Sequence, residues 1–219
     1  MKTIAAIISV FFVAHAHAEV DVSIGATKFY QAHDGIWIQE AFPHEKSLVS
    51  PSAAVAIVFR KNEPWSYRLG AVYVGKVTSS AKAVTDVEYI NSEKKCVPQP
   101  PTFCALTTYN GSGTVSGLTF SARRTWNGYF IEPGLILERS TWHMDIPDMM
   151  HYMGKDYPRW HYHVDHKVRP QLLPTLAIGY KHKDITVKLS AIPTVGHGDE
   201  YQPLYRGVSF NLSAGWTFK

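Results

Sequence analysis

The last thirteen residues, 207–219, alternate strictly between two kinds of side chain. One set is apolar and comprises Val208, Phe210, Leu212, Ala214, Trp216 and Phe218, whereas the residues between them are small or polar and uncharged. Alternation over about eleven residues suits a tilted membrane-crossing strand. A half-buried soluble strand usually stops after about five or six residues. The stretch therefore predicts a strand with one face toward lipid and the other toward a narrow barrel interior.

The first 18 residues have the pattern of a secretory signal peptide. Lys2 supplies the charged start, residues 4–13 form an apolar run, and Ala16-His17-Ala18 matches the cleavage pattern. An apolar run of about ten residues is too short to cross a bilayer as a helix. We therefore expect residues 1–18 to be cleaved on export and residues 19–219 to form one outer-membrane domain.

The composition favours strands rather than helices as the membrane-crossing elements. No later stretch reaches the roughly twenty consecutive apolar residues that a transmembrane helix needs, yet 45% of the residues are hydrophobic and 13% are aromatic. A β-barrel reconciles these observations because it places its apolar side chains at alternate positions. The net charge of +4 comes without a run of Lys and Arg, so nucleic acid is not an expected partner.

Seven further stretches are predicted as strands, at about residues 20–30, 52–60, 65–77, 114–124, 129–140, 167–180 and 185–192. Their connections alternate between long and short, and one short connection contains Asn127-Gly128, the strongest short hairpin signal. Outer-membrane barrels sort their connections in this way, with short periplasmic turns and long extracellular loops. Aromatic residues near the strand ends, including Trp142 on the loop side, predict girdles at both interfaces. We predict an all-β, eight-stranded antiparallel transmembrane β-barrel in the bacterial outer membrane.

Over its mature length the chain resembles the small outer-membrane barrels of the OmpA/OmpX type. The resemblance lies in the strand and loop pattern, and Lys219 departs from the aromatic last residue that is common in such proteins. It implies a rigid, non-enzymatic barrel with a closed polar lumen. The expected partners are outer-membrane lipid and lipopolysaccharide, the barrel assembly machinery and an unknown partner of the surface loops. No cofactor is expected.

Residues 172–180 and 191–193 are also similar to the late strands of the lipid A palmitoyltransferases. In that family prolines interrupt hydrogen bonding between strands and open a lateral path to lipid, and Pro174 and Pro193 are placed to do the same. The family uses a loop His together with an Asp-Ser pair after the third strand. His33, Ser79 and Ser80 are the nearest candidates here, but no Asp adjoins the serines. A lipid A acyltransferase is therefore the alternative function, and a small pore is the third.

Charged residues on the predicted inward faces are the first candidate site. An eight-stranded lumen is just wide enough to be filled by side chains, and charges buried there must pair. We expect an ion-pair network that closes the pore. Its predicted members are Arg68, Lys76, Arg123, Glu132, Glu138, Arg169 and Lys188.

The predicted loop at about residues 141–166 is rich in His, Asp and aromatic residues. His161, His163 and Asp165 share one face of an extended chain, so they are a possible metal site. Their spacing matches no standard metal motif, and a packed surface loop or a partner-binding patch is the other interpretation. The two cysteines, Cys96 and Cys104, lie close together in an exported chain and predict a disulfide.

Overall fold

The structure is a computed structural model that describes residues 18–29, 44–47, 49–60, 65–87, 103–152, 155–167, 169–194 and 207–218. Every regular element in these ranges is a β-strand. No helix among the described residues is long and apolar enough to span a bilayer. The strands are β1 (Ala18–Lys28), β2 (His44–Ser47), β3 (Val49–Arg60), β4 (Trp65–Val87), β5 (Phe103–Trp126), β6 (Tyr129–Tyr152), β7 (Lys155–Lys167), β8 (Gln171–His182), β9 (Ile185–Thr194) and β10 (Gly207–Phe218).

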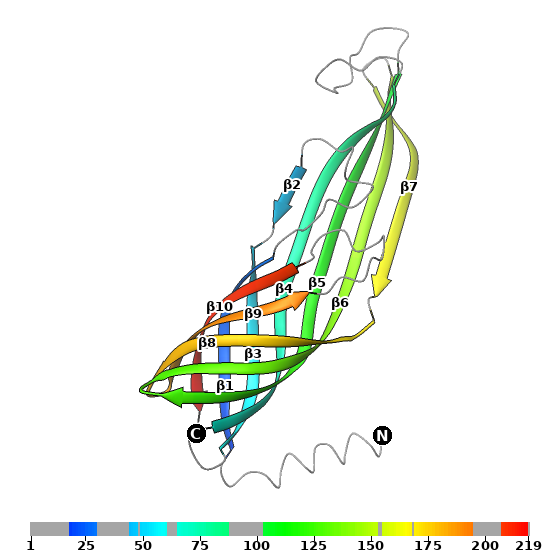
Figure 1. Ribbon diagram of the computed structural model, residues 1–219. Helices are drawn as coiled ribbons and strands as arrows, with labels where there is room; N and C mark the ends of the chain where they lie inside the picture. The colour runs from blue at the N-terminus through cyan, green and yellow to red at the C-terminus, as the bar shows by residue number, and fades with distance from the viewer. Residues whose placement is uncertain are drawn as a thin grey trace.

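Within the described ranges, eight strands close into an antiparallel barrel in the order β1-β3-β4-β5-β6-β8-β9-β10, with β10 pairing back onto β1. The predicted fold class is therefore confirmed. β1 begins and β10 ends at the same end of the barrel (Figure 1). The even number of barrel strands accounts for this arrangement, since each strand reverses the direction of the one before it.

Alternation along β10 sorts its side chains between lipid and lumen as the sequence predicts. All six apolar residues from Val208 to Phe218 are exposed on the outside, whereas Ser209, Ser213 and Thr217 are buried. The outer faces of β8 and β9 continue the apolar surface with Leu172, Leu176, Ile178, Val187 and Leu189. Because water cannot satisfy backbone groups in a bilayer, a closed ring with such a surface is one of the few structures that can cross it.

Three barrel strands continue far beyond the ring and form an extension where the sequence predicts loops. β4, β5 and β6 contain 23, 24 and 24 residues. β2 pairs with the outer part of β4, and β7 pairs with the outer part of β6. Figure 1 shows this sheet projecting from one end of the barrel. The loop prediction was wrong for these residues. Trp142, Met144 and Ile146 alternate with polar neighbours as in a strand, but the polar composition of the segment indicated a loop.

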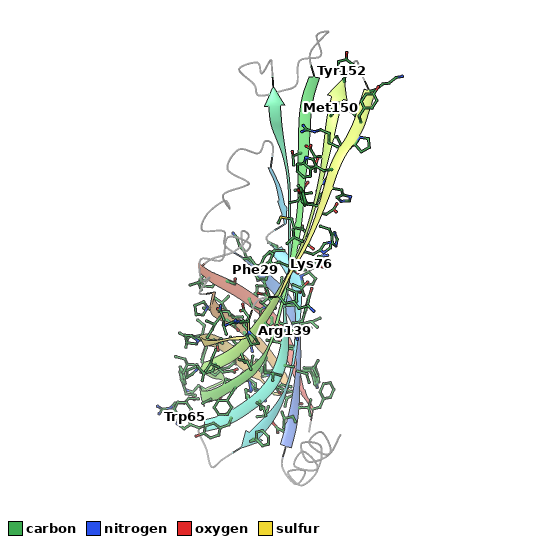
Figure 2. All side chains as sticks on the ribbon, turned by 90° about the vertical axis from the view of Figure 1, so that its right-hand side faces the viewer. Phe29, Trp65, Lys76, Arg139, Met150 and Tyr152 are labelled. Atoms are coloured by element: carbon green, nitrogen blue, oxygen red, sulfur yellow. The ribbon has the colours of Figure 1, made fainter. Side chains whose placement is uncertain are left out.

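A bulge on β4 marks the junction between barrel and extension. The β4–β5 register shifts between Tyr73 and Gly75, and Val74 and Gly75 are both buried. Gly75 has φ +149, and a Cβ there would lie 2.8 Å from the Ser50 Cβ. The Ser50 hydroxyl also accepts a hydrogen bond from the Lys76 backbone N–H at 2.7 Å. The shift reverses the faces of β4, so Lys76 is exposed (Figure 2).

The opposite end of the barrel carries the tight turns. Asn127 and Gly128 have φ values of 49° and 86°, the two positive values that a type I′ turn requires. The rings of Tyr129 and Tyr180 pack in a tilted arrangement beside this turn with centroids 5.0 Å apart, and Trp65 lies exposed at the same end (Figure 2). Trp142 does not belong to the opposite girdle. It is buried on the inward face of β6, where its ring covers Gly113.

Candidate functional site

Glu132 is the centre of a charged cluster inside the barrel. It is 6% exposed. Its Oε2 accepts hydrogen bonds from Arg68 Nη1 at 3.1 Å and Arg123 Nε at 2.6 Å. Its Oε1 accepts one from the Ser121 hydroxyl at 2.9 Å and lies 3.9 Å from Lys188 Nζ. One carboxylate thus joins three cations, because strands β4, β5, β6 and β9 turn these positions toward the same part of the lumen.

Two further contacts hold the cations in place. Arg68 also pairs with Asp21 on β1, so this arginine bridges two carboxylates. The Arg123 guanidinium lies 3.7 Å from the centroid of the Phe130 ring, a cation–π geometry. A cavity of about 110 Å³ is lined by Asp21, Arg68, Arg123, Glu132 and Lys188, and it has room for several waters.

Toward the extension the lumen wall is polar on β1, β3 and β10, where Thr27, Ser52 and Ser209 are buried, and largely apolar on the strands from β4 to β9. Val74, Val115, Ile136, Leu173 and Ile192 are all buried on inward faces there. This apolar region beside the ion pairs differs from the polar lumen that the sequence predicted. One residue in the sequence indicated this apolar region: Ile136, which lies four residues beyond Glu132 and therefore on the same inward face of β6.

Four of the seven residues predicted for the lumen network meet in the structure. Arg68, Arg123, Glu132 and Lys188 form the cluster. Glu138 is buried on the same face of β6, six residues further along. The prediction was wrong for Lys76 and Arg169, which are both exposed. The bulge turns Lys76 outward, and Arg169 precedes β8, which begins at Gln171.

A second cluster lies on the extension, outside the membrane-spanning ring. His143 Nδ1 lies 2.7 Å from Asp165 Oδ1, and His161 Nε2 lies 2.5 Å from Asp145 Oδ1. The hydrogen bond with His143 lowers the pKa of Asp165, and that with His161 lowers the pKa of Asp145. Both carboxylates are thus held in the ionised form that pairs with imidazolium or binds a cation.

The predicted metal set of His161, His163 and Asp165 is only partly assembled. His163 and Asp165 are brought together with His143, whereas His161 bonds to Asp145. His143 comes from β6, eighteen or more residues before the others, so its contribution depends on strand pairing. Spacing within one strand could not identify it.

The candidate catalytic residues and the cysteines are largely outside what the structure describes. His33 and Cys96 lie outside the described residues, and Ser79 and Cys104 are described only as parts of β4 and β5. The Ser80 hydroxyl donates a hydrogen bond to the Asn110 side-chain oxygen at 2.8 Å, on the extension. The disulfide and the acyltransferase site therefore stay predictions.

The two prolines singled out in the late strands lie where one ladder ends. Pairing between β8 and β9 runs from His182↔Ile185 to Leu176↔Ala191 and goes no further among the described residues. Two positions on, the same register places Pro174 opposite Pro193. Neither residue has an N–H to donate, which explains the end of the ladder.

These features define a class of protein. A closed antiparallel ring of eight strands, apolar outside and ion-paired inside, is the architecture of the small outer-membrane β-barrels, and this chain has that fold.

Comparison with known proteins adds no family beyond this class. No protein-family model and no curated protein matches the chain. Among solved structures, Ail, the attachment invasion locus protein of Yersinia pestis, is 12% identical over 92% of this chain and 99% of its own, with a TM-score of 0.37. Neisserial surface protein A is 12% identical over 92% and 96%, with a TM-score of 0.31. The assignment to the class rests on the strand order and the two faces of the barrel.

Proposed function

We propose that this protein is a non-enzymatic outer-membrane barrel that presents the β4–β7 extension outside the cell as a contact surface. The main support for this proposal is that β4, β5 and β6 continue past the ring as a paired sheet, with β7 as its free edge among the described strands. Outer-membrane barrels place their long connections on the outside. Lipid and lipopolysaccharide then surround the ring, and the extension is offered to a partner at the surface.

Buried contacts near the far end support a fixed shape for this surface. The Thr107 hydroxyl on β5 donates a hydrogen bond at 2.7 Å to Asp148 Oδ1 on β6, and Asp148 is 1% exposed. Arg159 Nε on β7 lies 3.4 Å from the other oxygen of the same carboxylate. Three strands are thereby tied together, so the surface is preorganised and pays little ordering entropy on contact.

Aromatic residues on β7 supply the contact area. Trp160 and Tyr162 are exposed on the face opposite to the histidines, and their rings meet edge to face at 4.8 Å. Tyr157 is exposed on the same strand. Tyr and Trp are enriched at protein interfaces because each combines a large apolar body with a polar tip. A protein partner at this face fits better than strand addition, since Pro158 and the charged residues interrupt the edge.

Display can be tested by labelling intact cells. In a Cys96→Ser, Cys104→Ser background, Tyr157→Cys should react with a membrane-impermeant maleimide on whole cells. Asn127→Cys, at a short turn, should react only after the outer membrane is permeabilised. If Asn127→Cys alone were labelled on intact cells, the short turns would face outside the cell, and the proposal would be refuted.

Contact can be tested by a photoreactive benzophenone amino acid placed at Trp160, with Leu212 as the control position. We expect protein adducts from position 160 in living cells and lipid adducts from position 212. Lipid adducts at both positions, or none at 160, would contradict a surface partner.

One observation favours a second candidate function, lipid A acyl transfer. The end of the β8–β9 ladder at Leu176↔Ala191 lies beside the buried apolar residues Leu173 and Ile192, so a lipid chain reaching the gap would meet apolar surface. The test is incubation of the purified barrel with radiolabelled phospholipid and lipid A. The leading proposal expects no transfer of label, whereas transfer that is lost on combining Ser79→Ala with Ser80→Ala supports the enzyme.

A further inference from the structure

Five His and Asp residues share the outer face of the β6–β7 hairpin. In the ladder His143 lies opposite Asp165, and Asp145 lies opposite His163. Residues opposite each other in an antiparallel pair point to the same face, as do alternate residues along a strand. His161, two positions before His163, therefore joins the same face. This row lies on the side away from Trp160 and Tyr162, so it is separate from the aromatic contact area of the extension.

Three of these side chains converge closely enough to share one cation. The ligand atoms of His143, His163 and Asp165 all lie within 4.8 Å of one another. His143 Nδ1 lies 2.7 Å from Asp165 Oδ1, and His163 Nε2 lies 3.9 Å from Asp165 Oδ2. Tetrahedral Zn²⁺ with ligands at about 2.0–2.1 Å needs ligand separations of about 3.3 Å. All three side chains are exposed, so small rotations supply the difference.

Neighbouring groups orient this set. Asp145 Oδ1 lies 3.7 Å from His163 Nδ1, whereas the other ring nitrogen, Nε2, pairs with Asp165. The same oxygen lies 2.5 Å from His161 Nε2. A carboxylate on the second nitrogen of a histidine ligand fixes the ring's tautomer and direction. Asp145 is thus placed as the supporting carboxylate, and His161 as the group that holds it.

We propose that His143, His163 and Asp165 bind a transition-metal dication of the Zn²⁺ type, with a fourth position left to water. Two imidazoles and one carboxylate suit Zn²⁺ and Cu²⁺, whereas Ca²⁺ and Mg²⁺ require sets made of oxygen ligands. The ligands come from both strands, so the bound ion crosslinks the edge strand β7 to β6 beyond the membrane.

Calorimetric titration of the full mature chain in detergent, without an affinity tag, tests the site. We expect one Zn²⁺ per chain and no binding of Mg²⁺. Separate His143→Ala and His163→Ala variants should lose this event, and Asp145→Asn should bind about 10–100-fold more weakly, the range for supporting ligands. His182→Ala, which removes an exposed histidine from the opposite end of the barrel, should bind as the wild type does.

Two results would overturn the site. One is wild-type affinity in both His143→Ala and His163→Ala, and the other is an equal loss in His182→Ala, which would indicate scattered surface binding. Heat-modifiable migration on gels shows that each variant is folded before titration. X-ray absorption of the zinc-loaded wild type needs no variant: we expect two imidazoles in the first shell, and a shell without imidazole refutes the proposal.

Discussion

Replacing Glu132 by Gln is the most direct perturbation of the barrel interior. The side chain keeps its size but loses the charge that joins Arg68, Arg123 and Lys188. Asp21 still pairs with Arg68, whereas Arg123 and Lys188 lose the carboxylate that they both contact. Removing one partner of a buried ion pair costs about 3–5 kcal/mol because the remaining charge is left uncompensated. We expect Glu132→Gln to lower the free energy of unfolding by about that amount.

The assay is a urea titration of protein folded into phospholipid vesicles, followed by tryptophan fluorescence. Asp165→Asn, in metal-free buffer, is the matched control: it removes an exposed carboxylate that is hydrogen-bonded to His143, and it should cost much less than Glu132→Gln. A double variant with Arg123→Gln should be less destabilised than the sum of the two single variants, with a coupling of about 0.5–3 kcal/mol.

The reasoning is refuted if Glu132→Gln costs no more than the exposed control. It is also refuted by strict additivity with Arg123→Gln, because two groups joined at 2.6 Å must share their contribution. Either result would mean that water entering the cavity already screens these charges.

Two further predictions concern the membrane-facing surface and the turn. Leu212→Arg should lower the free energy of unfolding by about 2–4 kcal/mol because it places a charge against lipid halfway along β10. Tyr129→Arg, at the turn end, should lower it by about 0–1 kcal/mol. Equal losses in the vesicle titration would contradict the assigned depths. Gly128→Ala should cost roughly 1–3 kcal/mol, because Gly128 has φ +86 and an added Cβ would lie 2.6 Å from the Tyr180 ring. An unchanged unfolding midpoint for this variant would show that the turn tolerates a side chain.

Features that depend on neighbours in the chain could be predicted from the residues alone. The two faces of β10 follow from strict alternation, and the turn at Asn127-Gly128 follows from the low cost of positive φ at these residues. The even number of barrel strands followed from counting such segments. The same local signal was present in Trp142, Met144 and Ile146, but the polar residues between them led to the loop assignment.

Features that depend on how strands are paired required the tertiary structure. A single bulge at Val74–Gly75 turned Lys76 out of the barrel, because one extra residue reverses a period of two. Glu132 meets Arg68, a residue 64 positions away, and His143 meets His163 across the hairpin. Which side chains face one another is set by the register between strands. Register depends on the closure of the whole ring, and no single segment of the sequence carries that information.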